Sequence, residues 1–308
     1  MLQFIMRRGL KAVATMFLVL TAVFFFTRLT GNPFERESMM GNLTPEMLQE
    51  LQAYYGLDKP VWVQYVNYLG GLMQGYAGRS VHRVGQLVTE AYGLALMKTG
   101  KLAIWCVPLG LIVGIPLGIV GALRKDRAIG QAAMAAAFVG YAFPNFIIAI
   151  GLILIFSFTL RWLPSMGDAT AAHYIMPILT LSAAQIASIA RFTRSSMLDV
   201  LSQDYIRTAR GKGMPRRTVT FKHALRNALI PVVTIFGTQV ASLLTGSMIV
   251  ETIFAWPGFG HLLITSVQRR DYAVVQFGVL ITAAIVVTSN LLVDIAYSVI
   301  DPRIRSEA

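Results

Sequence analysis

The sequence of 308 residues is poor in cysteine, in histidine and in charge. Its single cysteine, Cys106, lies in an apolar run, which excludes a disulfide framework and a cysteine metal site. The four histidines are scattered, without the spacing of a metal-binding motif. Charged residues make up 14% of the chain, against about 25% in soluble globular domains. These scarcities argue against an ordinary soluble enzyme or metalloprotein.

Apolar residues are abundant instead: AVILMFWYC account for 55% of the chain, which also excludes intrinsic disorder. A helix needs about 20 apolar residues to cross a bilayer. Six segments qualify: Ala12–Leu29, Leu102–Leu123, Ala132–Leu160, the region near Ala171–Ala190, Ala228–Phe254 and Ala273–Ile300. Pro144 predicts a kink in the third. The sequence therefore predicts an all-α polytopic membrane protein with six transmembrane helices.

The net charge of +12 is concentrated in alternate loops. Three Lys or Arg precede the first span, three lie in residues 124–131, nine in residues 191–227 and two in the tail, which is 17 of 27. Cytoplasmic loops carry such an excess, so we expect both termini inside and the loop 191–227 cytoplasmic. The basic balance then marks topology and not nucleic-acid binding. It leaves an N-terminal anchor helix (residues 1–30), an extracytoplasmic segment (31–100) and a five-helix core (101–308).

Both parts outside the bilayer contain helix signals. In the outer segment, Thr44 before Pro45 is typical of a helix start, and Gly56 is a natural stop. In the cytoplasmic loop, Ser202 can cap a helix that ends at Gly213 in the left-handed conformation, with a second helix starting at Pro215. Two interpretations stay open for this loop. It is a lever that a cytoplasmic partner grips, or it is a solvated basic loop that only sets topology.

The loop also carries a resemblance. The string Asp204-Tyr205-Ile206-Arg207-Thr208-Ala209-Arg210-Gly211-Lys212-Gly213 resembles the coupling helix of ABC-importer permeases, in the form typical of the peptide-importer branch. The strings Gly56-Leu57-Asp58-Lys59-Pro60, Glu251-Thr252-Ile253-Phe254-Ala255-Trp256-Pro257-Gly258-Phe259-Gly260 and Asp301-Pro302-Arg303-Ile304-Arg305 are similar to the same branch. The chain thus looks like the first-type permease subunit of the dipeptide, oligopeptide, glutathione and nickel importer family.

The resemblance implies binding-protein-dependent peptide transport across a bacterial inner membrane. Such a non-catalytic subunit pairs with a second, homologous permease as a heterodimer, surrounded by membrane lipid. Two cytoplasmic ATPases bind below it, and an extracytoplasmic substrate-binding protein delivers the solute. ATP and Mg are held by the ATPases, and no cofactor, metal or nucleic acid is expected on this chain. The implied coupling residues are Asp204, Tyr205, Arg207, Thr208, Ala209, Arg210 and Gly213.

The two Gly-Lys pairs, Gly100-Lys101 and Gly211-Lys212, lack the remainder of a phosphate-binding loop, so ATP hydrolysis is expected on other chains. Two further groups of residues stand out. Trp256, Pro257, Gly258 and Gly260 predict a rigid outer turn and a candidate gate. Gly110, Gly114 and Gly118 form a bare helix stripe on which another helix can pack, either from this chain or from the partner permease.

The substrate stays open between small peptides and, in the same family, nickel, metal-chelate or opine compounds. Two remoter classes are an ion-coupled secondary transporter and an intramembrane enzyme. The first favours internal repeats, of which none is clear in the sequence. The second needs a nucleophile beside a base, and Thr245-Gly246-Ser247-Met248 is not a nucleophile elbow. No catalytic residue is therefore expected.

Overall fold

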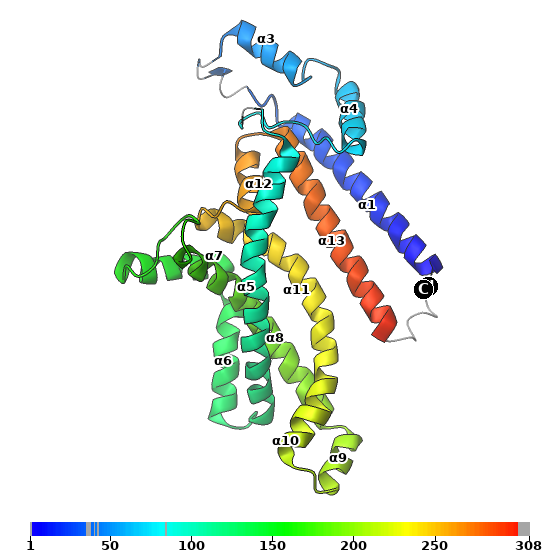
Figure 1. Ribbon diagram of the computed structural model, residues 1–308, viewed down its shortest axis with the longest axis vertical. Helices are drawn as coiled ribbons and strands as arrows, with labels where there is room; N and C mark the ends of the chain where they lie inside the picture. The colour runs from blue at the N-terminus through cyan, green and yellow to red at the C-terminus, as the bar shows by residue number, and fades with distance from the viewer. Residues whose placement is uncertain (1, 35–37, 40, 42, 84, 301–308) are drawn as a thin grey trace. The chain divides into compact units, whose positions relative to one another are not determined.

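The structure is a computed structural model that describes residues 2–34, 38–39, 41, 43–83 and 85–300. Side chains are described outside residues 2–5, 233–242, 244–246 and 292–300. The named elements of this part of the chain are all helices (Figure 1). They are α1 (Leu2–Leu29), α3 (Pro45–Tyr54), α4 (Val61–Met73), α5 (Val88–Leu123), α6 (Ala128–Ala142), α7 (Asn145–Leu152), the π-helix η1 (Ile153–Thr159), α8 (Ala172–Leu201), α9 (Asp204–Gly211), α10 (Arg216–Thr218), the π-helix η2 (Val219–Ala224), α11 (Leu225–Ile253), α12 (Phe259–Gln268) and α13 (Tyr272–Ile300).

Four of these helices contain segments long and apolar enough to cross a membrane: Met6–Leu29, Val88–Leu123, Ala172–Leu201 and Tyr272–Leu291. A fifth candidate is a bent pair, Ala128–Ala142 with Asn145–Thr159, whose two halves meet at 101°. With several apolar helices and no extended sheet among the described residues, the chain is an all-α polytopic membrane protein. The all-α membrane class expected from composition is confirmed, whereas the expected number of six spans stays a prediction.

The third apolar segment differs from the expected single kinked span. Its helix stops at Ala142 and restarts at Asn145. Phe143 between them is extended, with φ −107° and ψ 132°, because the ring of Pro144 disfavours helical geometry in the residue before it. Proline also supplies no N–H to continue the hydrogen-bond ladder. The outcome is a sharp break at Pro144, and the expectation of a continuous helix with a kink is wrong.

Helix α5 starts at Val88, well before Leu102, where its apolar run begins. Lys98 and Lys101 lower the hydropathy of this first part, but lysine is a good helix former. Lys98 also forms an ion pair with Asp168. In contrast, the predicted outer helix is confirmed at both ends: the Thr44 hydroxyl accepts a hydrogen bond from the backbone N–H of Met47. Gly56 follows with φ +67°.

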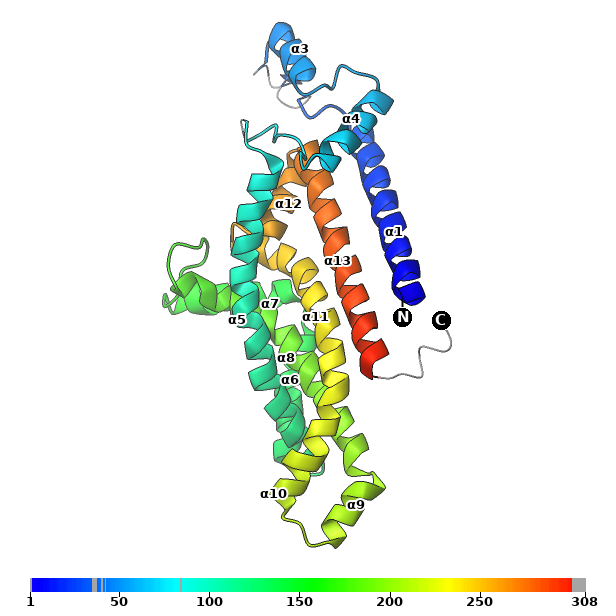
Figure 2. The same cartoon turned by 45° about the vertical axis from the view of Figure 1, so that its right-hand side comes forward.

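The chain divides into two compact units. The first comprises Met1–Met97 and His261–Val287, and the second Lys98–Gly260 and Thr288–Ala308. In the first unit, α1 and the start of α13 run side by side, with α4 beside the C-terminal end of α1 (Figure 2). The amide of Gln276 donates to Thr27 at 2.7 Å, which ties α13 to α1. Buried Asp271 accepts from Ser80 at 2.5 Å and from the backbone N–H of Val81 at 3.1 Å, which ties the loop before α5 to the start of α13.

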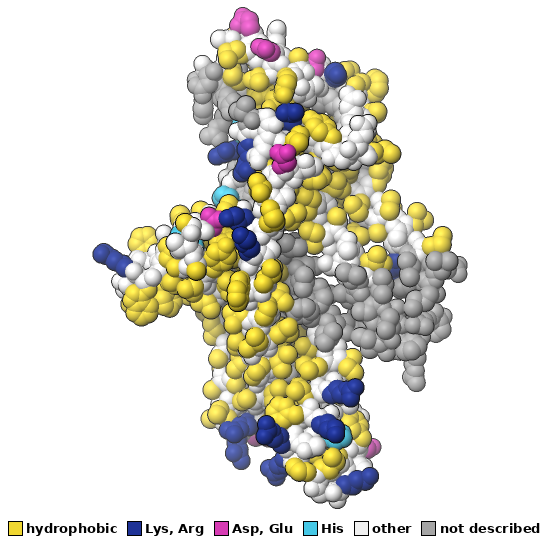
Figure 3. Space-filling model, in the orientation of Figure 1, with side chains coloured by type: hydrophobic (Ala, Val, Ile, Leu, Met, Phe, Trp, Pro, Cys, Tyr) yellow, Lys and Arg dark blue, Asp and Glu magenta, His cyan; other side chains and the backbone are white. Residues whose placement is uncertain are grey.

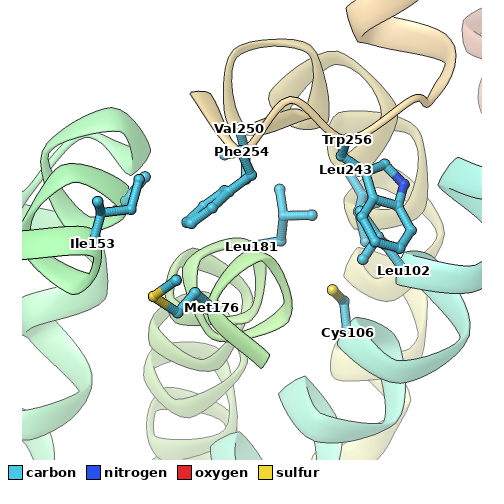
Figure 4. Packing of buried hydrophobic residues seen from close by; sticks show 10 residues of the cluster. Leu102, Cys106, Ile153, Met176, Leu181, Leu243, Val250, Phe254 and Trp256 are labelled. Atoms are coloured by element: carbon cyan, nitrogen blue, oxygen red, sulfur yellow. The ribbon is translucent and has the colours of Figure 1, made fainter. Parts of the chain in front are cut away.

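In the second unit, α8 packs against α6, α7 and α11. Its main apolar cluster draws side chains from α5, α7, η1, α8, α11 and the turn after α11 (Figure 4). The buried members are Leu102, Cys106, Ala149, Ile153, Met176, Leu181, Leu243, Val250, Phe254 and Trp256. A second cluster lies where α9, η2 and the end of α8 meet. The first cluster holds the turn after α11, and the second holds α9.

Candidate functional site

Helix α9 has one buried face and one exposed face. Ile206 is fully buried and Ala209 is 8% exposed. Both pack into the second cluster, with Ala122, Met197, Val219, Ala224 and Ala228. The other side chains of the predicted coupling set on this helix are exposed: Asp204, Tyr205, Arg207, Thr208 and Arg210. Ala209 therefore anchors α9 to its own chain, whereas the exposed residues are available to another molecule.

Helix α9 ends in a C-terminal capping motif built on a left-handed glycine. Gly213 has φ +73°, a conformation that glycine adopts without the steric cost that a Cβ imposes. Its N–H donates to the carbonyl of Arg210 at 3.0 Å, and the N–H of Met214 donates to the carbonyl of Ala209 at 3.3 Å. This pair of bonds satisfies the last carbonyls of the helix. The chain then turns sharply into α10, whose N-terminal cap is Pro215.

The start of α9 differs from the expectation. Ser202 does not cap it: its hydroxyl donates to the carbonyl of Asp199 at 2.7 Å. The reason is that α8 continues to Leu201, so Ser202 serves as the C-terminal cap of α8. Gln203 takes the N-cap position of α9 without a side-chain hydrogen bond.

Tyr205 connects α9 to the start of α11. Its hydroxyl accepts a hydrogen bond of 2.8 Å from the side-chain amide of Asn227. The Arg207–Asp204 pair on the exposed face is 3.8 Å apart, and its side chains are 84% and 97% exposed, so it adds little stability. The exposed charges of α9 are thus not consumed by internal structure.

Basic side chains gather around α9, α10 and the turn between α5 and α6, while the adjoining surface of α5 and α6 is largely hydrophobic (Figure 3). The exposed members are Arg124, Lys125, Arg127, Arg207, Arg210, Lys212, Arg216, Arg217, Lys222 and Arg226. A cationic face beside an apolar belt is what the positive-inside rule produces at a cytoplasmic membrane surface. The same face carries the exposed side of α9.

The end of α11 and the connection into α12 (residues 251–260, the Glu251 turn) bury their charged side chain instead of exposing it. Glu251 is fully buried. Its carboxylate accepts a hydrogen bond of 2.6 Å from the Thr99 hydroxyl and one of 2.7 Å from the backbone N–H of Gly260. Thr99 in turn accepts from the N–H of Phe259 at 2.8 Å. A buried charge is costly unless its lone pairs are satisfied, and here α5 and the turn itself supply the donors.

The residues of the predicted outer turn lie in the Glu251 turn and pack around its hydrogen bonds. Trp256 is fully buried, donates from Nε1 to the carbonyl of Lys98 at 3.2 Å and meets Tyr174 edge-on at 4.5 Å. A Cβ on Gly258 would lie 2.5 Å from the Glu251 carboxyl carbon, and one on Gly260 would collide with the backbone of Met248. Pro257 is the exposed member of the set. Glycine is therefore required here by close approach.

The glycine stripe of α5 lies against α8 of the same chain. A Cβ on Gly114 would come within 2.9 Å of Ile189, and one on Gly118 within 2.5 Å of Thr193. A Cβ on Gly110 would lie 3.2 Å from Gln185. The side-chain hydroxyl of Ser182 on α8 also donates to the carbonyl of Cys106 on α5 at 3.4 Å. The neighbour left open by the sequence is thus an internal helix, at least over this part of α5.

Sequence reasoning missed Thr99 and Asp271, whose partners are far away in the chain, at Glu251 and Ser80. No local pattern identifies such pairs. Within the described residues, no three His, Cys, Asp or Glu side chains form a group that could hold a metal ion. The described residues thus combine a short helix with an exposed charged side, α9, and a turn whose buried carboxylate is hydrogen-bonded within the chain.

Comparison with known proteins agrees with this description. Residues 114–306 match the family of binding-protein-dependent transport system inner membrane components. Residues 1–105 match the N-terminal part of a binding-protein-dependent transport system membrane component.

The chain is 39% identical over 308 residues to the oligopeptide transport system permease protein OppB of Salmonella typhimurium, covering 99% of this chain and 100% of the relative. It is 41% identical over 305 residues to the glutathione transport system permease protein GsiC of Pectobacterium atrosepticum, covering 99% of each. Over an alignment 338 residues long, it is 38% identical to the dipeptide transport system permease protein DppB of Escherichia coli, and the alignment covers 99% of each chain.

Solved structures share the fold at lower identity. An amino acid ABC transporter with histidines gives a TM-score of 0.53 at 19% identity, covering 67% of this chain and 92% of that one. An inward-facing methionine ABC transporter gives a TM-score of 0.53 at 17% identity, covering 68% and 97%. The chain therefore belongs to the family of binding-protein-dependent transport system inner membrane components, the permease subunits of ABC transporters.

Proposed function

We propose that this chain forms half of the translocation path of an ATP-driven importer for small peptides of the dipeptide, oligopeptide or glutathione type. Its full-length relatives are permeases named for those solutes. The observation that carries the coupling part of the proposal is α9: a short helix, anchored by Ile206 and Ala209, with its charged side chains facing outward.

The proposed topology has six transmembrane helices and both termini in the cytoplasm. Helix α11, with 29 residues, has spanning length in addition to the four candidate helices and the bent α6–α7 pair. Alternate loops hold most of the Lys and Arg residues, which supports this orientation. Residues 1–30 then form an anchor helix, 31–100 lie on the outer side, and 101–308 form the permease core with the loop 191–227 inside.

The proposed partners follow from that division. A second, homologous permease completes the path, and two cytoplasmic ATPases bind below with ATP and Mg. An extracytoplasmic binding protein delivers the peptide. In this arrangement the exposed side of α9, with Tyr205, Arg207 and Arg210, enters a groove of one ATPase. Because α9 is fixed to the end of α8 and to the start of α11, movement of the ATPases is passed to both helices, and the spans rock between inward-facing and outward-facing states.

Reconstitution tests the proposal directly. The chain is co-expressed with its neighbouring permease, ATPase and binding-protein genes, and uptake is measured in proteoliposomes with labelled dipeptide, glutathione and Ni²⁺. We expect uptake of a peptide that requires both ATP and the binding protein. Peptide uptake without ATP would contradict the importer mechanism. ATP-driven uptake of Ni²⁺ without any peptide would overturn the substrate class.

A further inference from the structure

The first unit contains a partly open cavity of about 420 Å³. Its walls come from the last turn of α1, the loop after α3, helix α4, residues 76–81 and the start of α13, elements that lie together in Figure 2. The volume falls in the range of small-molecule sites, about 300–1,000 Å³. Because residues 54–57 and 64–81 belong to the segment proposed to lie outside, the cavity would be reached from the outer side.

The lining of this cavity favours an anion. It includes two cations, Arg28 and Arg79, and contains no aspartate or glutamate among the described residues that form it. The other polar groups are phenols and amides: Tyr54, Tyr55, Gln64, Asn67, Tyr68, Tyr76, Tyr272 and Gln276. Such groups can donate hydrogen bonds to an anion and carry no negative charge that would neutralise the cations.

Arg28 is held in place but not neutralised. Its guanidinium carbon lies 4.3 Å from the Phe24 ring centroid and 5.0 Å from that of Tyr272. Its Nε donates to the side-chain oxygen of Gln64 at 2.9 Å, and Nη1 reaches Thr27 at only 3.5 Å. No carboxylate of the described residues forms an ion pair with it. A guanidinium presents five donors in a fixed fork that matches a carboxylate or a phosphate, and most of this fork is unused.

Two tyrosines of the cavity have unmet hydrogen-bonding groups. Tyr272 is 6% exposed, and its hydroxyl is buried with no hydrogen-bond partner in the described part of the chain. The buried hydroxyl of Tyr68 also has no partner there. Burial raises the pKa of Tyr68, so its phenol stays protonated and remains a donor. Unpaired buried polar groups are rare and costly. Both hydroxyls are covered by protein atoms, so a ligand in the cavity would pair them through a small side-chain shift.

We propose that this cavity binds the carboxylate of a small organic solute, with Arg28 as the charge partner and the hydroxyls of Tyr68 and Tyr272 as additional donors. A peptide C-terminal carboxylate is the ligand that fits the proposed function, on which this choice of ligand rests. The role goes beyond forming half of the path: the permease itself would recognise the charged end of the peptide before translocation.

The test is a binding titration on the full-length chain in lipid nanodiscs, purified with the subunits that accompany it but without the binding protein and without ATP. The probes are dialanine and its C-terminal amide, which differ only at the C-terminus, a carboxylate in one and an uncharged amide in the other. We expect dialanine to bind at least about tenfold more tightly than the amide, as charge-assisted hydrogen bonds require. Arg28→Gln should remove this preference, and Arg28→Lys should keep part of it. Lys11→Gln removes one exposed cation from the same helix and should change nothing.

Tyr272→Phe separates binding from folding. Because the Tyr272 hydroxyl has no hydrogen-bond partner in the described protein, its removal should leave the melting temperature unchanged or higher, yet weaken dialanine binding several-fold. A lower melting temperature with unchanged binding would assign the hydroxyl a structural role and overturn its part in the site. Equal binding of dialanine and its amide would overturn the proposal itself. Neither result depends on ATP-driven uptake, so a failure here is distinct from a failure of the importer mechanism.

Phospholipid is the other source of a suitable anion. Native mass spectrometry of the same samples, in nanodiscs with and without phosphatidylglycerol, separates the two. Retention of phosphatidylglycerol by the wild type, its loss in Arg28→Gln and the absence of any dialanine preference would assign the cavity to a lipid phosphate and overturn the solute proposal. We expect the dialanine preference to be the same in both nanodisc compositions.

Discussion

The α9 segment (residues 203–215) and the Glu251 turn (residues 251–260) are both short connections that depend on glycine, yet they use their polar groups in opposite ways. The Glu251 turn directs its carboxylate inward, where Thr99 and the N–H of Gly260 satisfy it. The α9 segment buries only Ile206 and Ala209 and leaves its charges exposed. A connection whose buried charge is hydrogen-bonded within the chain stabilises the fold. A connection that leaves its charges outward keeps them available to another molecule, which is the role proposed for α9.

The largest effect on stability is expected at the Glu251 turn. Glu251→Ala removes the acceptor for the Thr99 hydroxyl and the Gly260 N–H and leaves a cavity, so unfolding should become easier by about 3 kcal/mol or more. Thermal unfolding of the purified chain in detergent measures this. Glu90→Ala, an exposed acid in the first turn of α5, is the control and should shift stability by less than about 0.5 kcal/mol. Equal losses of stability in the two variants would show that the hydrogen bonds of Glu251 do not stabilise the fold.

A smaller effect is expected on the helix pair that supports both regions. Gly118→Ala brings a Cβ within 2.5 Å of Thr193 and 2.6 Å of the Ala190 carbonyl, and should cost about 1–3 kcal/mol through overpacking. Gly93 on the same helix has nothing within 4 Å of the added atom. Gly93→Ala should therefore stabilise α5 by up to about 1 kcal/mol. Melting curves that moved in the same direction for both would refute the close α5–α8 packing.

The α9 segment itself should show the smallest change in stability. Gly213→Ala forces a Cβ into the left-handed conformation at φ +73° and should cost about 1 kcal/mol. Gly211, at the end of the helix with open space around an added Cβ, offers the matched control, since Gly211→Ala should be neutral or slightly stabilising. Limited proteolysis of the loop measures the difference. We expect faster cleavage in Gly213→Ala alone. Equal cleavage rates in both variants would argue against a capping role of Gly213.

Local signals predicted some helix ends, and distant contacts decided the others. Thr44 and Gly213 act where the sequence places them, because their caps involve only near neighbours. Ser202 does not, because α8 extends to Leu201 and uses this serine for its own end. Pro144 marks the break in the third apolar segment, but the 101° bend is a tertiary outcome. Helices α4 and α12 were not expected either.

The candidate site divides in the same way. The exposed residues of α9 follow from a local motif, whereas the burial of Ala209 depends on η2 and α11. Glu251 is recognisable as an acid near a span end, but its donor Thr99 is far away in sequence. The cavity around Arg28 has no sequence signal at all, because its walls join residues from positions 28 to 276. A single sequence therefore predicts the exposed helix α9 but predicts neither the cavity around Arg28 nor the hydrogen bonds of Glu251.

The central claim is that the exposed charges of α9 serve coupling and not folding. Its most direct test is Arg207→Glu combined with Arg210→Glu, which leaves Ile206 and Ala209 untouched. Lys125→Glu with Arg127→Glu makes the same charge change on exposed residues between α5 and α6. We predict an unchanged melting temperature for both double variants, and ATP-driven peptide uptake reduced about tenfold or more in the α9 variant only. Normal uptake by the α9 variant at normal stability would contradict the account.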